Sequence, residues 1–331
     1  MAVTSTTGPA VSAGPVPSRR ASPAARSRAR RKWLEIGLFS GPAILVYIGF
    51  VLVPVVLAAF YSFWNWNGLG PLTRFVGIDN YVRVLNDPIF HRSVFNNFFI
   101  IGLSLLIQGP LAILVALLLN RRLRFRGLIR ALIFVPYVLS EVTAGLAWRI
   151  LLPSPNPPAV LGPFDTWMAA VGLGDLRQSW LSDPDIVMWT LFGILTWKYL
   201  GFAIILMLAG LSSVPEELSE AAAIDGAGWW QTQWHITIPL LGPTIRIWAF
   251  LSIIGALQLF DMVWIVTKGG PLHASSTMAT YMVEYGLNIT QIGYGSAVAV
   301  ILFIISLVIA LLYQRFALRR DLEGSLTSGV R

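Results

Sequence analysis

Several ionisable side chains lie inside long apolar runs of this sequence, where charges are costly. Glu141 and Arg149 are eight residues apart in one run. On a helix they would share a face and lie about 12 Å apart along the axis. Lys198 and Asp261 lie in two other runs. Because charges in such surroundings usually face protein or a water-filled path, these positions predict a polar path through an apolar body.

Aromatic and amide side chains accompany these charges. Such a mixture suits a hydroxyl-rich solute, because hydroxyls need hydrogen-bonding partners and the C–H faces of a sugar ring pack on flat aromatic rings. Some of these residues also suit another role, since Trp148 and Trp264 could form an interfacial belt and Arg149 could reach the outer surface. The candidates for lining a substrate path are Tyr137, Glu141, Trp197, Tyr199, Gln258 and Asp261.

Several kinds of catalytic chemistry are missing from the sequence. It contains no cysteine, and its three histidines, His91, His235 and His273, lie far apart, so no metal-ligand cluster is predicted. No G-x-x-x-x-G-K-[ST] phosphate loop occurs, because none of the few lysines follows a glycine. We expect no catalysis and no cofactor in this chain. An energy-requiring activity would depend on another subunit or on an ion gradient.

A longer stretch that is not an apolar run, residues 213–243, separates two of the apolar runs. Ser213 precedes Glu216 by three residues, which is the spacing of a capping box at a helix start. Alanines favour the helix, and Gly226 suits the left-handed residue that ends it. A second short helix is expected through Trp229, before prolines interrupt it. We predict a helix–turn–helix at a membrane surface, with a small-residue face that lets another protein approach closely.

The composition is that of an integral membrane protein. Of 331 residues, 56% are hydrophobic and 12% are charged, against about 25% charged in soluble domains. Each of six apolar runs has at least the ~20 residues that a helix needs to cross a bilayer. We therefore predict an all-α membrane protein with six transmembrane helices. The predicted spans are residues 36–62, 95–119, 127–151, 186–211, 244–267 and 295–317.

The distribution of basic residues predicts how these spans are oriented. Residues 120–130 contain five arginines, whereas residues 152–185 carry four aspartates against one arginine. The positive-inside rule then places both chain ends and residues 213–243 in the cytoplasm. The net charge of +8 lies mainly at the ends of the spans, so no nucleic-acid partner is expected.

The two ends of the chain differ from the rest in composition. Residues 1–32 are rich in Ser, Pro, Ala and Arg and contain no acidic residue, which predicts a disordered basic cytoplasmic tail. A transit peptide has a similar composition and is the alternative. Residues 33–320 form the expected transmembrane domain, and residues 321–331 a cytoplasmic C-terminal tail.

Residues 213–243 resemble the EAA motif found in permease subunits of ABC importers, and in its extended form the motif of the oligosaccharide (maltose-type) branch. Phe75–Tyr81 is similar to the FxGxxNY segment of that branch, and Lys268–Pro271 to its GGP segment. The resemblance extends over roughly residues 37–320. The matching motif residues are Glu220, Ala221, Ala222, Asp225, Gly226, Ala227, Ile236, Pro239 and Pro243.

The resemblance implies a type I permease fold in the cell (plasma) membrane and a heteromeric complex. Its parts would be a second, different permease subunit, a dimer of cytoplasmic ATP-binding subunits that hydrolyse ATP, an extracytoplasmic sugar-binding protein and a sugar substrate. The helix carrying Glu220 would be the coupling helix that docks on the ATPase, with Glu220 contacting an arginine there. Gly226 would set the turn and Asp225 would stabilise the loop. Glu141→Ala or Asp261→Ala is expected to lower uptake while assembly survives.

Three alternatives stay open. An ABC permease for another solute, such as a glycerol phosphate ester or a polyamine, would call for more intramembrane cations or acids than this sparse, balanced set. An ion-coupled secondary transporter would use Glu141 or Asp261 as a proton site, but such folds usually show repeated halves, and no internal repeat is visible. A membrane scaffold or receptor would support no solute uptake with any partner present.

Overall fold

The computed structural model of the protein describes residues 36–121, 124–152 and 162–318. Within these ranges the secondary structure is helical, and the only β-type pairing is an isolated bridge between Trp64 and Phe75. The prediction of an all-α protein is therefore confirmed for the described residues. The predicted tails, residues 1–32 and 321–331, lie outside them.

The described chain divides into two compact units, at Leu57. The first unit contains most of one long apolar helix, Ile36–Tyr61, whose side chains are largely exposed. This helix consists of helical residues 36–47, the π-helical turn η1 (Ile48–Leu52) and α2 (Val53–Tyr61), and its residues from Ala58 on belong to the second unit.

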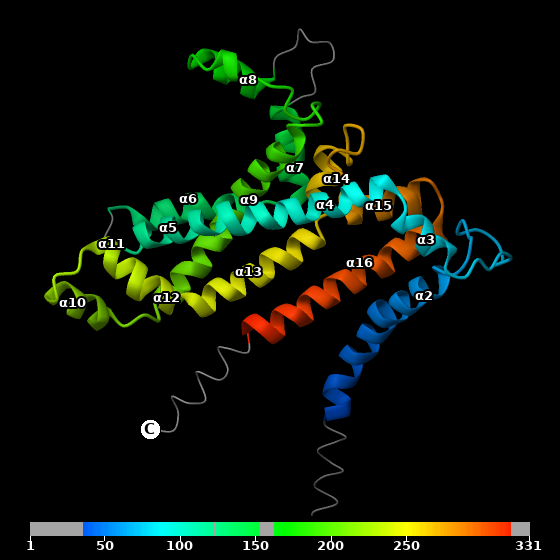
Figure 1. The fold of residues 1–331 in the computed structure, drawn as a ribbon, viewed down its shortest axis with the longest axis horizontal. Coiled ribbons are helices and arrows are strands. Elements are labelled where there is room, and N and C mark those ends of the chain that lie inside the picture. The colour runs from blue at the N-terminus through cyan, green and yellow to red at the C-terminus, as the bar shows by residue number, and fades with distance from the viewer. Residues whose placement is uncertain (1–35, 122–123, 153–161, 319–331) are drawn as a thin grey trace, which may run out of the picture. The chain divides into compact units, whose positions relative to one another are not determined.

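The second unit begins at Ala58 and holds the remaining elements (Figure 1). Its first half contains α3 (Asp79–Leu85), α4 (Pro88–Leu103), η2 (Ser104–Gln108), α5 (Gly109–Leu119), α6 (Arg126–Val138), α7 (Glu141–Leu151), α8 (Pro163–Ala170) and η3 (Gly174–Leu176). Its second half contains α9 (Val187–Leu211), α10 (Glu216–Ile224), α11 (Trp229–Thr232), η4 (Gln233–Thr237), α12 (Ile238–Leu240), α13 (Gly242–Leu257), α14 (Asp261–Val266), α15 (Met278–Val283), η5 (Glu284–Asn288), α16 (Ile292–Tyr313) and η6 (Gln314–Leu318).

Four helices in the described ranges are long and apolar enough to cross a membrane, and two bent helix pairs could supply two more spans. The first pair, Gly127–Val138 with Glu141–Leu151, is bent by 94°, and the second, Trp229–Leu240 with Gly242–Leu257, by 65°. The four unbroken helices are Ile36–Tyr61, Pro88–Leu119, Val187–Leu211 and Ile292–Ala317.

Two predicted spans are therefore not single helices. Residues 127–151 are interrupted because Leu139 is extended and the Ser140 side chain caps a new helix, accepting a hydrogen bond from the Thr143 N–H at 3.1 Å. Residues 244–267 are interrupted after Leu257, and α14 starts separately at Asp261.

Helix α9 is the most buried of the unbroken apolar helices and packs on α5 and α6. Its approach to α6 depends on Gly201, because a Cβ there would collide with the carbonyl oxygen of Ile133 and lie 3.1 Å from the Phe134 Cα. The glycine therefore lets the backbones of α6 and α9 approach each other closely.

Hydrogen-bonded polar side chains connect three helices at one end of the second unit. Asp87 caps α4 by accepting a hydrogen bond from the Ile89 N–H at 2.7 Å, and its other oxygen accepts one from the Tyr281 hydroxyl at 2.7 Å. Tyr281 also lies 2.6 Å from the Tyr294 hydroxyl. Burial raises the pKa of Tyr281, so its hydroxyl keeps the proton that it donates. These bonds tie the start of α4 to α15 and α16.

Candidate substrate cavity and coupling loop

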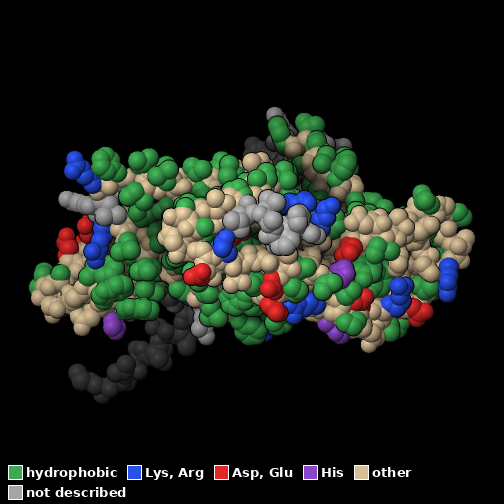
Figure 2. Space-filling model, turned by 90° about the horizontal axis from the view of Figure 1, so that it is seen from above, with side chains coloured by type: hydrophobic (Ala, Val, Ile, Leu, Met, Phe, Trp, Pro, Cys, Tyr) green, Lys and Arg blue, Asp and Glu red, His purple; other side chains and the backbone are tan. Residues whose placement is uncertain are grey.

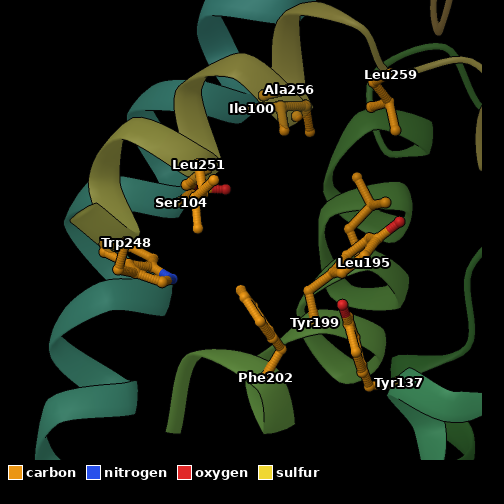
Figure 3. Close-up of a pocket in the computed structure, with 12 residues that line it drawn as sticks. Ile100, Ser104, Tyr137, Leu195, Tyr199, Phe202, Trp248, Leu251, Ala256 and Leu259 are labelled. Carbon is orange, nitrogen blue, oxygen red and sulfur yellow. The ribbon is translucent and has the colours of Figure 1, made fainter. Parts of the chain in front are cut away.

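A cavity of about 220 Å³ lies between α9 and α13. Figure 3 shows Tyr199 and Phe202 of α9 on one side of it and Trp248 and Leu251 of α13 on the other. Tyr137, from the end of α6, stacks on the Phe202 ring with 5.0 Å between centroids. The walls are mainly aromatic and aliphatic, with hydroxyl groups from tyrosine and serine. Such walls can pack against an apolar ring face and hydrogen-bond its hydroxyls.

Lys198 fixes the helix break beside this cavity. Its side chain is only 2% exposed, and its ammonium donates hydrogen bonds to the carbonyls of Pro136 and Tyr137, both at 3.3 Å, and to that of Leu139. The last carbonyls of a helix lack partners within the helix and carry partial negative charge. The lysine therefore caps the end of α6 and stabilises the chain where it turns.

Glu141 stands on the other side of the same break, as the first residue of α7. Its Oε1 lies 3.5 Å from the Lys198 ammonium and accepts a hydrogen bond from the Tyr199 hydroxyl at 2.7 Å. A carboxylate at a helix start and an ammonium at a helix end each complement the local dipole. The other oxygen, Oε2, is buried with no hydrogen-bond partner among the described residues, which leaves an acceptor for another group.

The predicted path residues fall into two groups. Tyr137 and Tyr199 line the cavity, and Glu141 is joined to it through Tyr199. The others lie outside the cavity wall: Trp197 packs edge-on against Trp148 at 5.4 Å, Gln258 is exposed at the end of α13, and Asp261 is exposed at the start of α14.

Sequence reasoning noted Lys198 as a charge in an apolar run but did not choose it as a site residue. The backbone carbonyls and the Glu141 carboxylate become partners of Lys198 because the chain turns at Leu139. The apolar run by itself does not predict that turn. The available signals were Pro136 inside the helix and the potential cap Ser140. Phe202 and Trp248 were also missed, because apolar residues in spans carry no pattern that separates a cavity wall from a packed face.

Residues 213–243, the candidate coupling loop (below, the coupling loop), form the predicted helix–turn–helix. Gly226 has φ +80°, and two hydrogen bonds close the end of α10: Ala227 N–H to Ala222 O at 2.9 Å and Gly226 N–H to Ala223 O at 3.1 Å. This is a Schellman ending, in which glycine is favoured because the left-handed conformation has no Cβ penalty.

The predicted capping box at Ser213 is wrong. Pro215 is the N-cap of α10 and makes no side-chain cap, while the Ser213 hydroxyl donates to the Gly210 carbonyl at 2.7 Å. The Ser213 hydroxyl instead bonds the end of α9, because a short hydroxyl side chain readily donates to a backbone carbonyl three or four residues before it, and with Pro215 as the N-cap the serine lies outside the capping position of α10.

The motif residues of α10 differ in exposure. Ala222 is buried and packs toward the rest of the unit, whereas Glu220, Ala221, Asp225 and Gly226 are exposed. No side-chain hydrogen bond or ion pair involves Glu220 or Asp225 among the described residues. Acidic and basic side chains lie among hydrophobic ones at this end of the molecule, on the left of Figure 2. The outer face of α10 is thus free to contact another protein.

The sequence of the chain is similar to those of known proteins. The family described as "Binding-protein-dependent transport system inner membrane component" matches residues 108–321. A probable ABC transporter permease protein of Pyrococcus horikoshii is 36% identical over 277 residues, which are 83% of this chain and 93% of that protein. The arabinooligosaccharides transport system permease protein AraP of Bacillus subtilis is 30% identical over 303 residues, 90% of this chain and 93% of its own.

A solved structure shares the fold. A chain of the bacterial ABC transporter involved in the import of the acidic polysaccharide alginate superposes with a TM-score of 0.76 at 24% identity, over 89% of this chain and 98% of that one. Together with the family match over residues 108–321, this shows that the chain belongs to the binding-protein-dependent transport system inner membrane components and has the fold of an ABC importer permease.

Proposed function

We propose that this chain is the transmembrane permease subunit of an ATP-driven importer for a sugar or oligosaccharide. The observation that carries the proposal is the aromatic, hydroxyl-bearing cavity between α9 and α13, because its chemistry suits a neutral polyhydroxylated solute. Relatives named for arabinooligosaccharides and for lactose support the same substrate class.

The topology proposed for the chain has six spans with both ends in the cytoplasm. The four unbroken apolar helices and the two bent pairs supply the candidates for those spans. Arginines at 120–130 and acidic residues at 152–185 support the orientation. The transmembrane domain would cover residues 33–320, between two cytoplasmic tails.

The partners proposed are a second permease subunit, two cytoplasmic ATP-binding subunits and an external sugar-binding protein. A structurally similar bacterial alginate ABC transporter has been solved in complex with an alginate pentasaccharide-bound periplasmic protein, which supports the last of these. The exposed Glu220, Ala221 and Gly226 would meet the ATPase, while buried Ala222 would hold α10 against its own subunit. Asp225 would stabilise the loop at that contact.

The substrate path proposed runs past the helix break at Leu139. Tyr137 and Tyr199 would offer ring faces to the substrate, and Glu141 would act on the path through its Oε1, which holds the Tyr199 hydroxyl at the cavity wall. Trp197, Gln258 and Asp261 lie outside the cavity wall and would meet the substrate further along the path. Closure of the ATPases would pull on α10 and switch the access of the cavity from one side to the other. The chain itself would hydrolyse nothing.

The test is uptake of labelled di- and oligosaccharides by cells with this chain intact or deleted, with and without ATP depletion, at a constant proton gradient. Deletion-sensitive, ATP-dependent uptake of one sugar is the expected result and would name the substrate. Uptake that survives ATP depletion but is lost with the gradient would overturn the proposal in favour of a secondary transporter. Asp261→Ala should lower uptake while assembly survives, and full uptake would remove Asp261 from the path.

A further inference from the structure

The segment after the coupling loop carries two large exposed aromatic side chains. Trp230 in α11 is 56% exposed and Trp234 in η4 is 63% exposed. They are four residues apart, so they lie about one helical turn from each other on one face. Ring contacts within the chain do not cover them: among the described residues, Trp230 makes a ring contact only with its neighbour Trp229, at 4.5 Å. A pair of tryptophans at the end of a span is typical of a membrane–water interface.

The helix that follows supports a position at the interface. Helix α13 has 16 residues, which at 1.5 Å per residue makes about 24 Å, short of the ~30 Å hydrocarbon core. Residues Trp229–Leu240 and Gly242–Leu257 together have the composition of one broken span, bent by 65°. A segment that continues a span in composition but turns away from its axis suits the boundary of the bilayer.

A basic side chain lies on Trp229, whose ring contacts that of Trp230. The Arg121 guanidinium, at the end of α5, stands 3.9 Å from the centroid of the Trp229 ring. Arg121 and Arg124 are both exposed. An arginine held against an aromatic ring at the end of a span can donate hydrogen bonds to a phosphate while its flat face stays covered.

We propose that Arg121, Trp230 and Trp234 form a lipid-binding surface, the Trp patch, that sits in the headgroup region of an anionic phospholipid leaflet. The indole rings would lie at the level of the glycerol backbone and the arginine would bind lipid phosphate. Because Trp230 and Trp234 come soon after Gly226 and α10 in the chain, this contact holds the coupling loop at a fixed depth. Lipid binding itself is independent of the substrate, and only its effect on coupling rests on the proposed function.

Site-directed fluorescence tests the lipid contact without a change of background, since the chain contains no cysteine. Trp230→Cys, Trp234→Cys and the control Ile224→Cys, a position that is 86% exposed on α10, are labelled with the same fluorophore in the full chain. Each is placed with its partner permease in nanodiscs that contain phosphatidylglycerol and a lipid with a nitroxide near the headgroup. Quenching at 230 and 234 should be at least threefold stronger than at 224.

Equal quenching at all three positions would overturn the proposal. The proposal would also be overturned if the labels at 230 and 234 became shielded from solvent only when the ATP-binding subunits are added, because the surface would then bind protein. If the tryptophan variants fail to assemble, Arg121 provides the second measurement.

Arg121→Gln removes one phosphate contact and should raise the phosphatidylglycerol fraction needed for half-maximal transport about fivefold, as expected for one basic residue near an anionic surface. Arg121→Lys keeps the charge and should stay close to the parent. The same lipid dependence in the parent and in Arg121→Gln would count against the patch, whereas failure of sugar transport in every lipid would count against the proposed function instead.

Discussion

The helix break at Leu139 and the coupling loop at Gly226 are both turns between helices, but they are completed in different ways. At the break, the buried Lys198 ammonium bonds three carbonyls and pairs with Glu141, so the turn is satisfied within the chain. At the coupling loop, backbone hydrogen bonds end α10 and the Gln231 side chain accepts one from the Gly228 N–H at 2.8 Å, whereas the charged Glu220 and Asp225 have no side-chain partner in the described residues.

The difference follows from where each turn lies. In the proposed topology the break lies inside the membrane, where no water can satisfy a broken helix, so unpaired backbone groups must find a side chain. A loop that water can reach has no such need, and its side chains remain available for another protein. The break should therefore respond to substitution through folding, and the loop through assembly. The expected effect on folding decreases from the break to the outer face of the loop.

Lys198→Met should have the largest effect, because it strips the end of α6 of its cap and leaves Glu141 without its cation. Breaking a buried pair costs about 3–5 kcal/mol, and the partial exposure of Glu141 places the expected loss near the lower end, at about 3 kcal/mol. Thermal unfolding of the purified chain in detergent measures it. Adding Glu141→Gln should recover part of the loss, and a Lys198→Met variant as stable as the parent would show that the pair does not hold the break.

Gly201→Ala should come next. Its new methyl group collides with the backbone of α6 at Ile133, so the α6–α9 pair must separate; overpacking of this kind costs about 1–3 kcal/mol. Gly193, in the same helix, is the matched control, since a Cβ there meets nothing within 4 Å. Gly193→Ala should be neutral or slightly stabilising. Equal melting temperatures for the two variants would contradict the close contact.

The coupling loop and the helix break at Leu139 show how far the sequence predicts the structure. Hydropathy located the apolar runs, and glycine after Asp225 located the end of α10, because both depend on local composition. The bend at Leu139 and the bonds of Lys198 depend on what lies beside each helix, which one sequence does not display. The Ser213 cap failed for a related reason: a carbonyl of α9 was a nearer partner than the N–H groups of α10.

Gly226→Val should affect the loop more than the fold. Its φ of +80° is unfavourable for a residue with a Cβ and worse for a β-branched one, at about 1–2 kcal/mol. No atom lies within 4 Å of the added Cβ, so the cost is confined to the backbone of the loop. The amount of chain in the membrane should be unchanged, while co-purified ATP-binding subunit falls. Gly226→Asn should be tolerated better, because asparagine accepts the left-handed conformation; full retention by the valine variant would separate Gly226 from coupling.

Glu220→Ala should leave folding unchanged, because the side chain is exposed and alanine is a good helix former. If Glu220 bonds a cationic group of the ATPase, its loss should weaken docking by about 1.5–3 kcal/mol, or roughly 10- to 150-fold. Titration of permease nanodiscs with the ATP-binding subunit measures this. Glu217→Ala, an equally charged and exposed change in the same helix, is the control for general acidity. Equal losses in both variants would mean that the loop attracts its partner by charge alone, and a loss confined to Glu220 would make the outer face of α10 a specific contact that the chain leaves open for another protein.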